Sequence, residues 1–153
     1  LSRMAEGLSY EKALDDAKSK GYAEANPSLD IDGYDAAAKL VIMANWVMGM
    51  KVTMKDVNRV GIAGVKSADV GKAMKQGSAV KLIATCDGKS LAVRPTEVAK
   101  TDPICVNGTL NAVTFSSEHS GQQTIIGRGA GGIETASAIL RDLIEIRDTV
   151  FER

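Results

Sequence analysis

The sequence is poor in the residues that build metal centres and disulfide frameworks: its 153 residues include one histidine and two cysteines. Cys86 and Cys105 lie in separate apolar segments, without the spacing of metal ligands. We therefore predict two reduced, mostly buried thiols of a cytoplasmic protein, and no metal site. A cysteine–histidine nucleophile is disfavoured as well, because neither cysteine has a histidine beside it in sequence, and the one histidine, His119, lies in an expected hairpin turn over 116–122.

An excess of one charge and long apolar runs are also missing. The 19 basic side chains balance 19 acidic ones, and neither sign forms a block, which argues against nucleic acid or an anionic membrane as a partner. The uncharged stretches 40–50 and 103–117 are shorter than the roughly 20 apolar residues needed to cross a bilayer. Since 44% of the residues are hydrophobic, we expect one core and a single domain over 1–153.

Helices are predicted where apolar residues recur at helical spacing behind a capping residue: 10–20 after Ser9, 34–48 after Asp30 or Asp32, and short helices after Thr53 and Ser67. The helix over 34–48 should stop at Gly49. Its apolar residues surround it on almost every side, so we expect it to be central in the domain.

Strands are predicted in the second half of the chain. Two β-rich runs flank Asp87-Gly88, a two-residue hairpin signal, and two more flank the turn 118–121. A glycine-rich turn and an amphipathic helix close the chain. Helices, then strands, then a final helix predict an α+β fold with a mixed or antiparallel sheet.

Asp35 and Lys39 are four residues apart and share one face of the predicted helix 34–48. Two interpretations are open. The pair is either an exposed salt bridge worth roughly a few tenths of a kcal/mol, or Lys39 is partly buried among apolar neighbours and passes a proton to a developing alkoxide.

Glu24, Asp30 and Asp32 precede this helix, where carboxylates commonly cap and solvate a helix start. If several point inward together, they instead hold the ammonium group of a small amino acid. The segment "GRGAGGIETA", 127–136, is likewise either a tight turn or a close approach of the backbone to a polar ligand. It is not the dinucleotide fingerprint, because no second βαβ unit follows it.

The run "GYAEANPSLDIDGYDAAAK", 21–39, resembles the signature of the homoserine dehydrogenases in the spacing of Asp30, Gly33, Asp35 and Lys39. The segment "GRGAGGIETASAILRDLIEI", 127–146, is similar to the closing motif of that family. The resemblance covers nearly the whole chain, although Ala25 and Asn26 depart from the usual loop. It implies an NAD- or NADP-dependent oxidoreductase of threonine and methionine biosynthesis that converts aspartate semialdehyde to homoserine.

The resemblance also implies residue roles. Lys39 is similar to the lysine that donates a proton to the aldehyde oxygen, with Asp35 beside it. Tyr22, Glu24 and Asp30 resemble the substrate-binding residues. The residues that resemble the segment near the nicotinamide are Gly129, Ala130, Gly131, Gly132 and Thr135. A cytoplasmic homodimer is expected by the same resemblance.

The amino-terminal dinucleotide-binding domain of that family has no counterpart in the sequence. We therefore expect a catalytic-domain fragment that is inactive alone, with 127–153 packing on the missing domain. The alternative is a stand-alone assembly or ligand-binding domain that has lost catalysis. A relation to the aspartate-semialdehyde dehydrogenases is disfavoured, because neither Cys86 nor Cys105 has the context of their nucleophile.

Overall fold

The structure of the protein, a computed structural model, describes residues 1–21, 23, 26–129 and 131–151. The chain divides into two compact units, Leu1–Lys100 and Thr101–Arg153, and each is described by itself. Three predicted site residues lie outside the described residues: Tyr22, Glu24 and Ala130.

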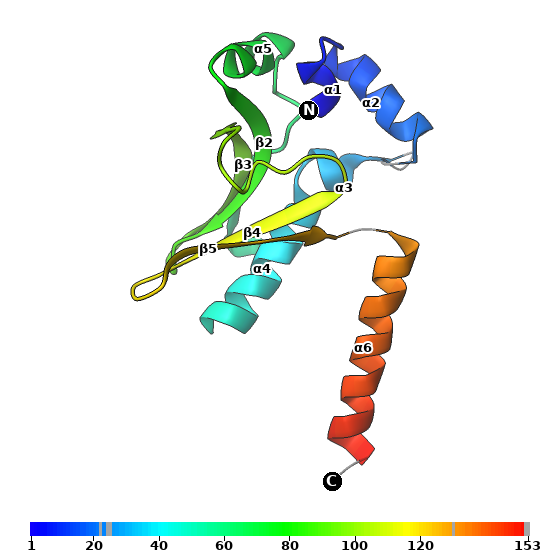
Figure 1. The fold of residues 1–153 in the computed structure, drawn as a ribbon, viewed down its shortest axis with the longest axis vertical. Helices are drawn as coiled ribbons and strands as arrows, with labels where there is room; N and C mark the ends of the chain where they lie inside the picture. Colours follow the sequence, from blue (N-terminus) through cyan, green and yellow to red (C-terminus); the bar gives the residue numbers. More distant parts are fainter. Residues whose placement is uncertain (22, 24–25, 130, 152–153) are drawn as a thin grey trace. The chain divides into compact units, whose positions relative to one another are not determined.

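The first unit combines helices with a small sheet (Figure 1). Its helices are α1 (Ser2–Ala5), α2 (Tyr10–Ser19), α3 (Ser28–Ile31), α4 (Tyr34–Met48) and α5 (Ser67–Lys75), with the 3₁₀ turn η1 (Met54–Asp56). Its strands are β1 (Val57–Arg59), β2 (Ser78–Cys86) and β3 (Leu91–Ala99). The second unit consists of β4 (Leu110–Ser117), β5 (Gly121–Arg128) and α6 (Gly132–Phe151). The predicted α+β class is confirmed.

The strands of the first unit form a mixed sheet in the order β1-β3-β2. β2 and β3 are antiparallel, with Cys86 opposite Leu91, whereas β1 runs parallel to β3. Val80 of β2 belongs to a buried cluster with α1, α2 and α5, and Leu82 packs against a second cluster formed by α4 and β3. Because side chains two residues apart on a strand share a face, these helices cover the same face of the sheet.

α4 is buried along one face only, which corrects the prediction of a central helix. Ala37, Leu40 and Ala44 are 0%, 7% and 1% exposed, and they pack toward β3. On the opposite face Ile42 is 60% exposed and Trp46 85%. An apolar composition therefore did not reveal which face of the helix has a partner within this unit.

The end of α4 explains the one amide of this helix, Asn45. The helix stops as predicted at Gly49, whose φ of 66° is left-handed. The Met50 N–H then donates to the Ala44 carbonyl at 3.1 Å, so the chain turns back onto the last turn of α4. The returning chain meets Asn45, whose Nδ2 donates to the Val52 carbonyl and whose Oδ1 accepts from the Val52 N–H, both at 2.9 Å. The amide thus pairs with the backbone as a neighbouring strand would.

Replacing Asn45 by leucine is expected to lower the free energy of unfolding by about 1–3 kcal/mol, because the half-buried Val52 N–H and carbonyl both lose their partner. Asn45→Asp keeps an acceptor for the Val52 N–H but has no donor for the Val52 carbonyl, so its free energy of unfolding should lie between those of the wild type and Asn45→Leu. Urea unfolding of the complete protein, followed by circular dichroism, measures both. A leucine variant as stable as the wild type would contradict this role.

Several local predictions need correction, whereas the Ser9 cap of α2 is confirmed by the Lys12 N–H at 3.3 Å. α4 is capped by Gly33 and not by Asp30 or Asp32, and the N-cap of α5 is Lys66 and not Ser67. The segment after Thr53 forms only the turn η1, closed by a Thr53–Asp56 capping box, and then the unpredicted strand β1.

The loop between β2 and β3 spans 87–90 and is thus longer than the predicted two-residue turn Asp87-Gly88. It is closed by the Asp87 carboxylate, which accepts from the N–H groups of Lys89 and Ser90. These last bonds also lower the pKa of Asp87.

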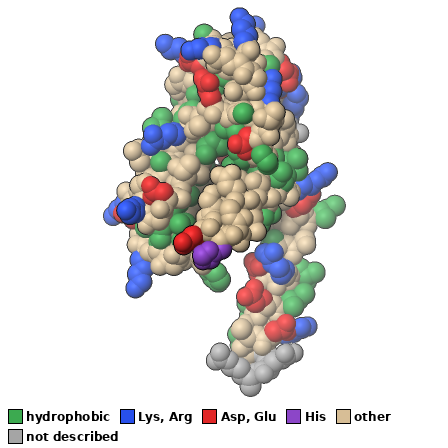
Figure 2. Space-filling view, turned by 60° about the vertical axis from the view of Figure 1, so that its left-hand side comes forward, with side chains coloured by type: hydrophobic (Ala, Val, Ile, Leu, Met, Phe, Trp, Pro, Cys, Tyr) green, Lys and Arg blue, Asp and Glu red, His purple; other side chains and the backbone are tan. Residues whose placement is uncertain are grey.

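In the second unit, β4 and β5 form the predicted hairpin, in register from Leu110 opposite Arg128 to Ser117 opposite Gly121. α6 exposes apolar side chains, among them Ile139 at 56% and Leu143 at 58%. Figure 2 shows acidic and basic side chains interspersed over the surface, with hydrophobic ones between them. Within the described ranges, no helix is both long and apolar enough to serve as a membrane span.

Candidate active site

The spacing of the aspartates in the signature corresponds to a turn between α3 and α4, held against the sheet. The Gly33 N–H donates to the Asp30 carbonyl at 3.1 Å, and the Gly33 carbonyl accepts from the Ala37 N–H at 3.0 Å. Gly33 has a φ of 76°, and a Cβ added there would lie 3.1 Å from Cγ1 of Val93. Left-handed backbone and close contact with β3 together require glycine at this position. The turn therefore enters α4 directly from the surface of the sheet.

Asp35 and Lys39 form the predicted ion pair at the start of α4, with 2.8 Å between Lys39 Nζ and Asp35 Oδ2. Their side chains are 52% and 57% exposed. Of the two interpretations left open, this unit shows the exposed salt bridge and not a partly buried Lys39, because both residues lie opposite the face that packs on β3. An exposed ammonium group held by one carboxylate can reach a ligand that approaches from outside the unit.

The exposed face of α4 continues beyond the ion pair as an apolar line. Ile42 and Trp46 follow Asp35 and Lys39 at helical spacing, so the four side chains share one face. The stretch 40–50 contains no charged residue. The paired charges therefore mark one end of an uncharged surface.

Asp30 lies in the first turn of α3 and is exposed. Asp30 is thus three residues before Gly33, on the helix that leads into the turn, whereas Asp35 is in the first turn of α4, after Gly33. The other two predicted substrate-binding residues, Tyr22 and Glu24, lie outside the described residues.

The predicted cofactor-contacting turn lies in the second unit, between β5 and α6. Gly131 has a φ of 140°, which an L side chain would strain, and its carbonyl accepts from the Thr135 N–H at 2.9 Å. Gly129 approaches the Asn111 side chain so closely that a Cβ would lie 2.7 Å from its Cγ. Gly132 and Thr135 are exposed at the start of α6, where the main-chain N–H groups before that of Thr135 lack helical partners. This arrangement fits an anion or a polar amide group.

Arg59 and Gly61 were not identified from the sequence, although both contact the aspartate turn. Arg59 donates from Nη1 to the main-chain carbonyl of Asp32. A Cβ at Gly61 would lie 2.4 Å from the Ile31 carbonyl oxygen. In the sequence these two residues stand in the run "VNRVGI", 57–62, whose first half is strand β1. The run was not recognised as a strand, so nothing in it indicated a contact with the aspartates.

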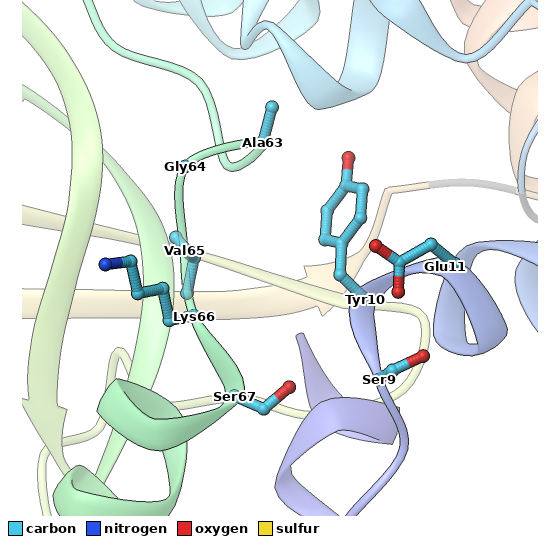
Figure 3. Close-up of a pocket in the computed structure, with 8 residues that line it drawn as sticks. All are labelled: Ser9, Tyr10, Glu11, Ala63, Gly64, Val65, Lys66 and Ser67. Atoms are coloured by element: carbon cyan, nitrogen blue, oxygen red, sulfur yellow. The ribbon is translucent and has the colours of Figure 1, made fainter.

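A pocket of about 460 Å³ lies elsewhere in the first unit, between the N-terminal ends of α2 and α5 (Figure 3). It is lined by Ser9, Tyr10, Glu11, Ala63, Gly64, Val65, Lys66 and Ser67. Burial, followed by the charges of Asp32 and Glu11, raises the pKa of the Tyr10 phenol. Figure 3 shows the Lys66 side chain extending away from Tyr10 and Glu11, and Asp30, Asp35 and Lys39 do not line the pocket. The pocket therefore shares none of its lining with these three residues, although the charge of Asp32 reaches Tyr10.

Neither cysteine forms a disulfide in the structure. Cys86 and Cys105 are free, half-buried thiols, and Sγ of Cys86 lies 3.5 Å from the Met50 sulfur. His119 is exposed in the turn between β4 and β5, as predicted. Among the residues with described positions, no three acidic, histidine or cysteine side chains gather in a way that could hold a metal ion.

Comparison with known proteins gives consistent matches. A family model described as homoserine dehydrogenase matches residues 1–144. The homoserine dehydrogenase of Methanocaldococcus jannaschii is 47% identical over 141 residues, which are 92% of this chain and 42% of that protein. The NAD(+)-dependent homoserine dehydrogenase of Pseudomonas canavaninivorans is 37% identical over 155 residues, 97% of this chain and 44% of that protein.

A solved structure is similar as well. A hyperthermophilic archaeal homoserine dehydrogenase mutant in complex with NADPH superposes with a TM-score of 0.81 at 31% identity, covering 94% of this chain and 42% of that one. The chain thus spans less than half of the length of each of these three proteins.

Proposed function

The chain belongs to the homoserine dehydrogenase family, and on this premise we propose that it is the substrate-binding and catalytic region of an NAD- or NADP-dependent homoserine dehydrogenase. Joined to the rest of the enzyme, it reduces aspartate semialdehyde to homoserine. The observation that carries the proposal is the Asp35–Lys39 ion pair, exposed on α4 directly after the glycine turn of the signature. One relative named as NAD(+)-dependent and one neighbour solved with NADPH support the class of cofactor.

Lys39 acts as the proton donor. As the aldehyde carbon is reduced, its C=O π bond breaks and negative charge develops on the oxygen, which takes a proton from Nζ. Asp35 holds the ammonium group at 2.8 Å and fixes its direction. Because Lys39 is more than half exposed in this unit, water can return the proton after each cycle. The reaction yields the alcohol, and Lys39 is protonated again before the next turnover.

The substrate carries an ammonium group as well as its aldehyde, and carboxylates are suited to bind it. We assign this role to Asp30 and Glu24, with Tyr22 in the same loop. Asp30 lies close along the chain to the proton donor, on the far side of the Gly33 turn. One rigid turn thereby sets the distance between the two ends of the substrate.

A nicotinamide cofactor, when bound, supplies the hydride. The residues of this chain that would contact its carboxamide are Gly129, Ala130, Gly131, Gly132 and Thr135, and the exposed N–H groups at the start of α6 suit that polar group. The remainder of the cofactor is bound by a dinucleotide-binding domain outside this sequence.

In the complete protein both units belong to one substrate-binding domain, 1–153, and the segment 127–153 packs on the dinucleotide-binding domain. The apolar side chains exposed along α6 support such packing. The enzyme is a cytoplasmic homodimer that acts on a small-molecule substrate, without nucleic acid or membrane partners.

Two measurements test this proposal. The coding region upstream of Leu1 should encode a dinucleotide-binding domain in frame, and a start codon immediately before Leu1 would contradict it. The complete protein should oxidise NADH or NADPH when aspartate semialdehyde is added, whereas the 153-residue chain alone should not. Absence of turnover by the complete protein would refute the activity.

A further inference from the structure

The turn that carries the aspartates is held from the side of the sheet by Arg59, the last residue of β1. Its Nη1 donates to the main-chain carbonyl of Asp32. Its guanidinium carbon lies 3.5 Å from the centroid of the Tyr34 ring, which is cation–π geometry. One half-buried side chain therefore contacts the residues on both sides of Gly33.

The chain around Arg59 is itself fixed to the sheet. The Val60 N–H donates to the Val93 carbonyl of β3 at 2.7 Å, and the Ile62 N–H donates to the Ile31 carbonyl at 2.8 Å. Gly61, between these two bonds, approaches the backbone of Ile31 without a side chain. A continuous set of contacts thus runs from β3 through 59–62 to the end of α3.

These contacts determine where α4 begins. Tyr34, under the guanidinium, is the first residue of α4, and Asp35 with its ion pair to Lys39 follows at once. Asp32, whose carbonyl accepts from Arg59, ends α3, the helix that contains Asp30. The direction of the lysine and the distance to the substrate-binding carboxylate therefore both depend on this turn. A misplacement of about 1 Å in a catalytic constellation costs on the order of 10²-fold in rate.

We propose that Arg59 is a positioning residue for the dehydrogenase reaction: it fixes the Asp32–Tyr34 turn and, through it, the relative placement of Asp30 and Lys39. This inference rests on the proposed function. The contacts described involve a carbonyl and an aromatic ring and not Asp30 or Asp35, so Arg59 influences the reaction through geometry.

The test uses steady-state kinetics of the complete enzyme. Arg59→Met keeps the aliphatic stem, which approaches Gly33, and removes the guanidinium. It should lower kcat/KM for aspartate semialdehyde between about tenfold and 10²-fold, with KM for the nucleotide unchanged. Arg59→Lys keeps a cation over Tyr34 and an N–H donor for the Asp32 carbonyl, so its kcat/KM should fall less than that of Arg59→Met. The stability control is Asn45→Leu, which should lower the unfolding midpoint and leave kcat/KM near the wild-type value.

Two further variants test the same contact if Arg59→Met fails to fold. Tyr34→Leu removes the ring and should reduce kcat/KM, whereas Tyr34→Phe keeps the cation–π contact and should not. Hydrogen exchange provides a readout independent of turnover: the Gly33 and Ala37 amides should exchange faster in Arg59→Met and in Tyr34→Leu, and at the wild-type rate in Asn45→Leu.

The outcomes separate the inference from the proposed function. If the wild-type enzyme does not reduce aspartate semialdehyde, the proposed function fails and the inference fails with it. If the wild type is active, three results overturn the inference alone. The first is an unchanged kcat/KM in Arg59→Met or Tyr34→Leu, and the second is a fall in kcat/KM in Asn45→Leu as large as in those variants. The third is an unchanged exchange rate of the Gly33 and Ala37 amides in Arg59→Met and Tyr34→Leu.

Discussion

Replacing Lys39 by alanine in the complete enzyme is expected to lower kcat by about two to four orders of magnitude, the usual contribution of a positioned general acid. The aldehyde oxygen would then develop its charge with only water to protonate it. KM for the substrate should change little, because the carboxylates that bind its ammonium group remain. Stopped-flow and steady-state assays of nucleotide oxidation measure both constants.

Two variants serve as controls for this result. Lys75→Ala removes an exposed lysine from the last turn of α5 and should leave kcat unchanged. Asp35→Asn keeps the amine but removes the carboxylate that holds it at 2.8 Å, so a smaller fall in kcat is expected. Assigning the proton donor to Lys39 would be wrong if Lys39→Ala retained a near-normal kcat.

Replacing Gly61 by alanine is expected to destabilise the complete protein by about 1–3 kcal/mol, the range for forcing an extra carbon into a packed site. The new Cβ would lie 2.4 Å from the Ile31 carbonyl oxygen and 2.7 Å from Cα of Asp32. Both are backbone atoms, so the clash can be relieved only by moving the segment 59–62 or the aspartate turn. KM for aspartate semialdehyde should therefore rise as the unfolding midpoint falls.

Gly64→Ala is the matched control for this prediction, because it adds the same methyl group three residues further along the same segment. A Cβ at Gly64 meets nothing within 4 Å, so the change in stability should stay within about 0.5 kcal/mol. Differential scanning calorimetry compares the two variants directly. Equal midpoints for Gly61→Ala and the wild type would show that the turn is not packed as described.

Sequence reasoning was most successful where local chemistry decides the outcome. Ser9 caps α2, Gly49 ends α4, and the spacing of Asp35 and Lys39 gives an ion pair. These features depend on residues within one or two helical turns of one another, and capping preferences and helical periodicity act over that range.

Predictions that depended on distant partners were less successful. The three-residue strand β1 has no periodicity of its own and exists because it pairs with β3. Gly33, and not an aspartate, is the N-cap of α4, because its φ of 76° is left-handed and a Cβ there would lie only 3.1 Å from Cγ1 of Val93 on β3. The apolar neighbours of Lys39 left its partial burial open, yet the helix turns that face away from β3. In each case the missing information was the position of the sheet.

The apolar line on the outer face of α4 has an optical consequence. The sequence contains one tryptophan, Trp46, which is 85% exposed and lies on the same helix face as Lys39. Indole emission shifts to shorter wavelength when water is replaced by apolar surroundings. The fluorescence of this residue therefore reports whether anything covers this face of α4. Trp46 is an intrinsic, label-free probe for a ligand or partner surface that approaches the Asp35–Lys39 pair.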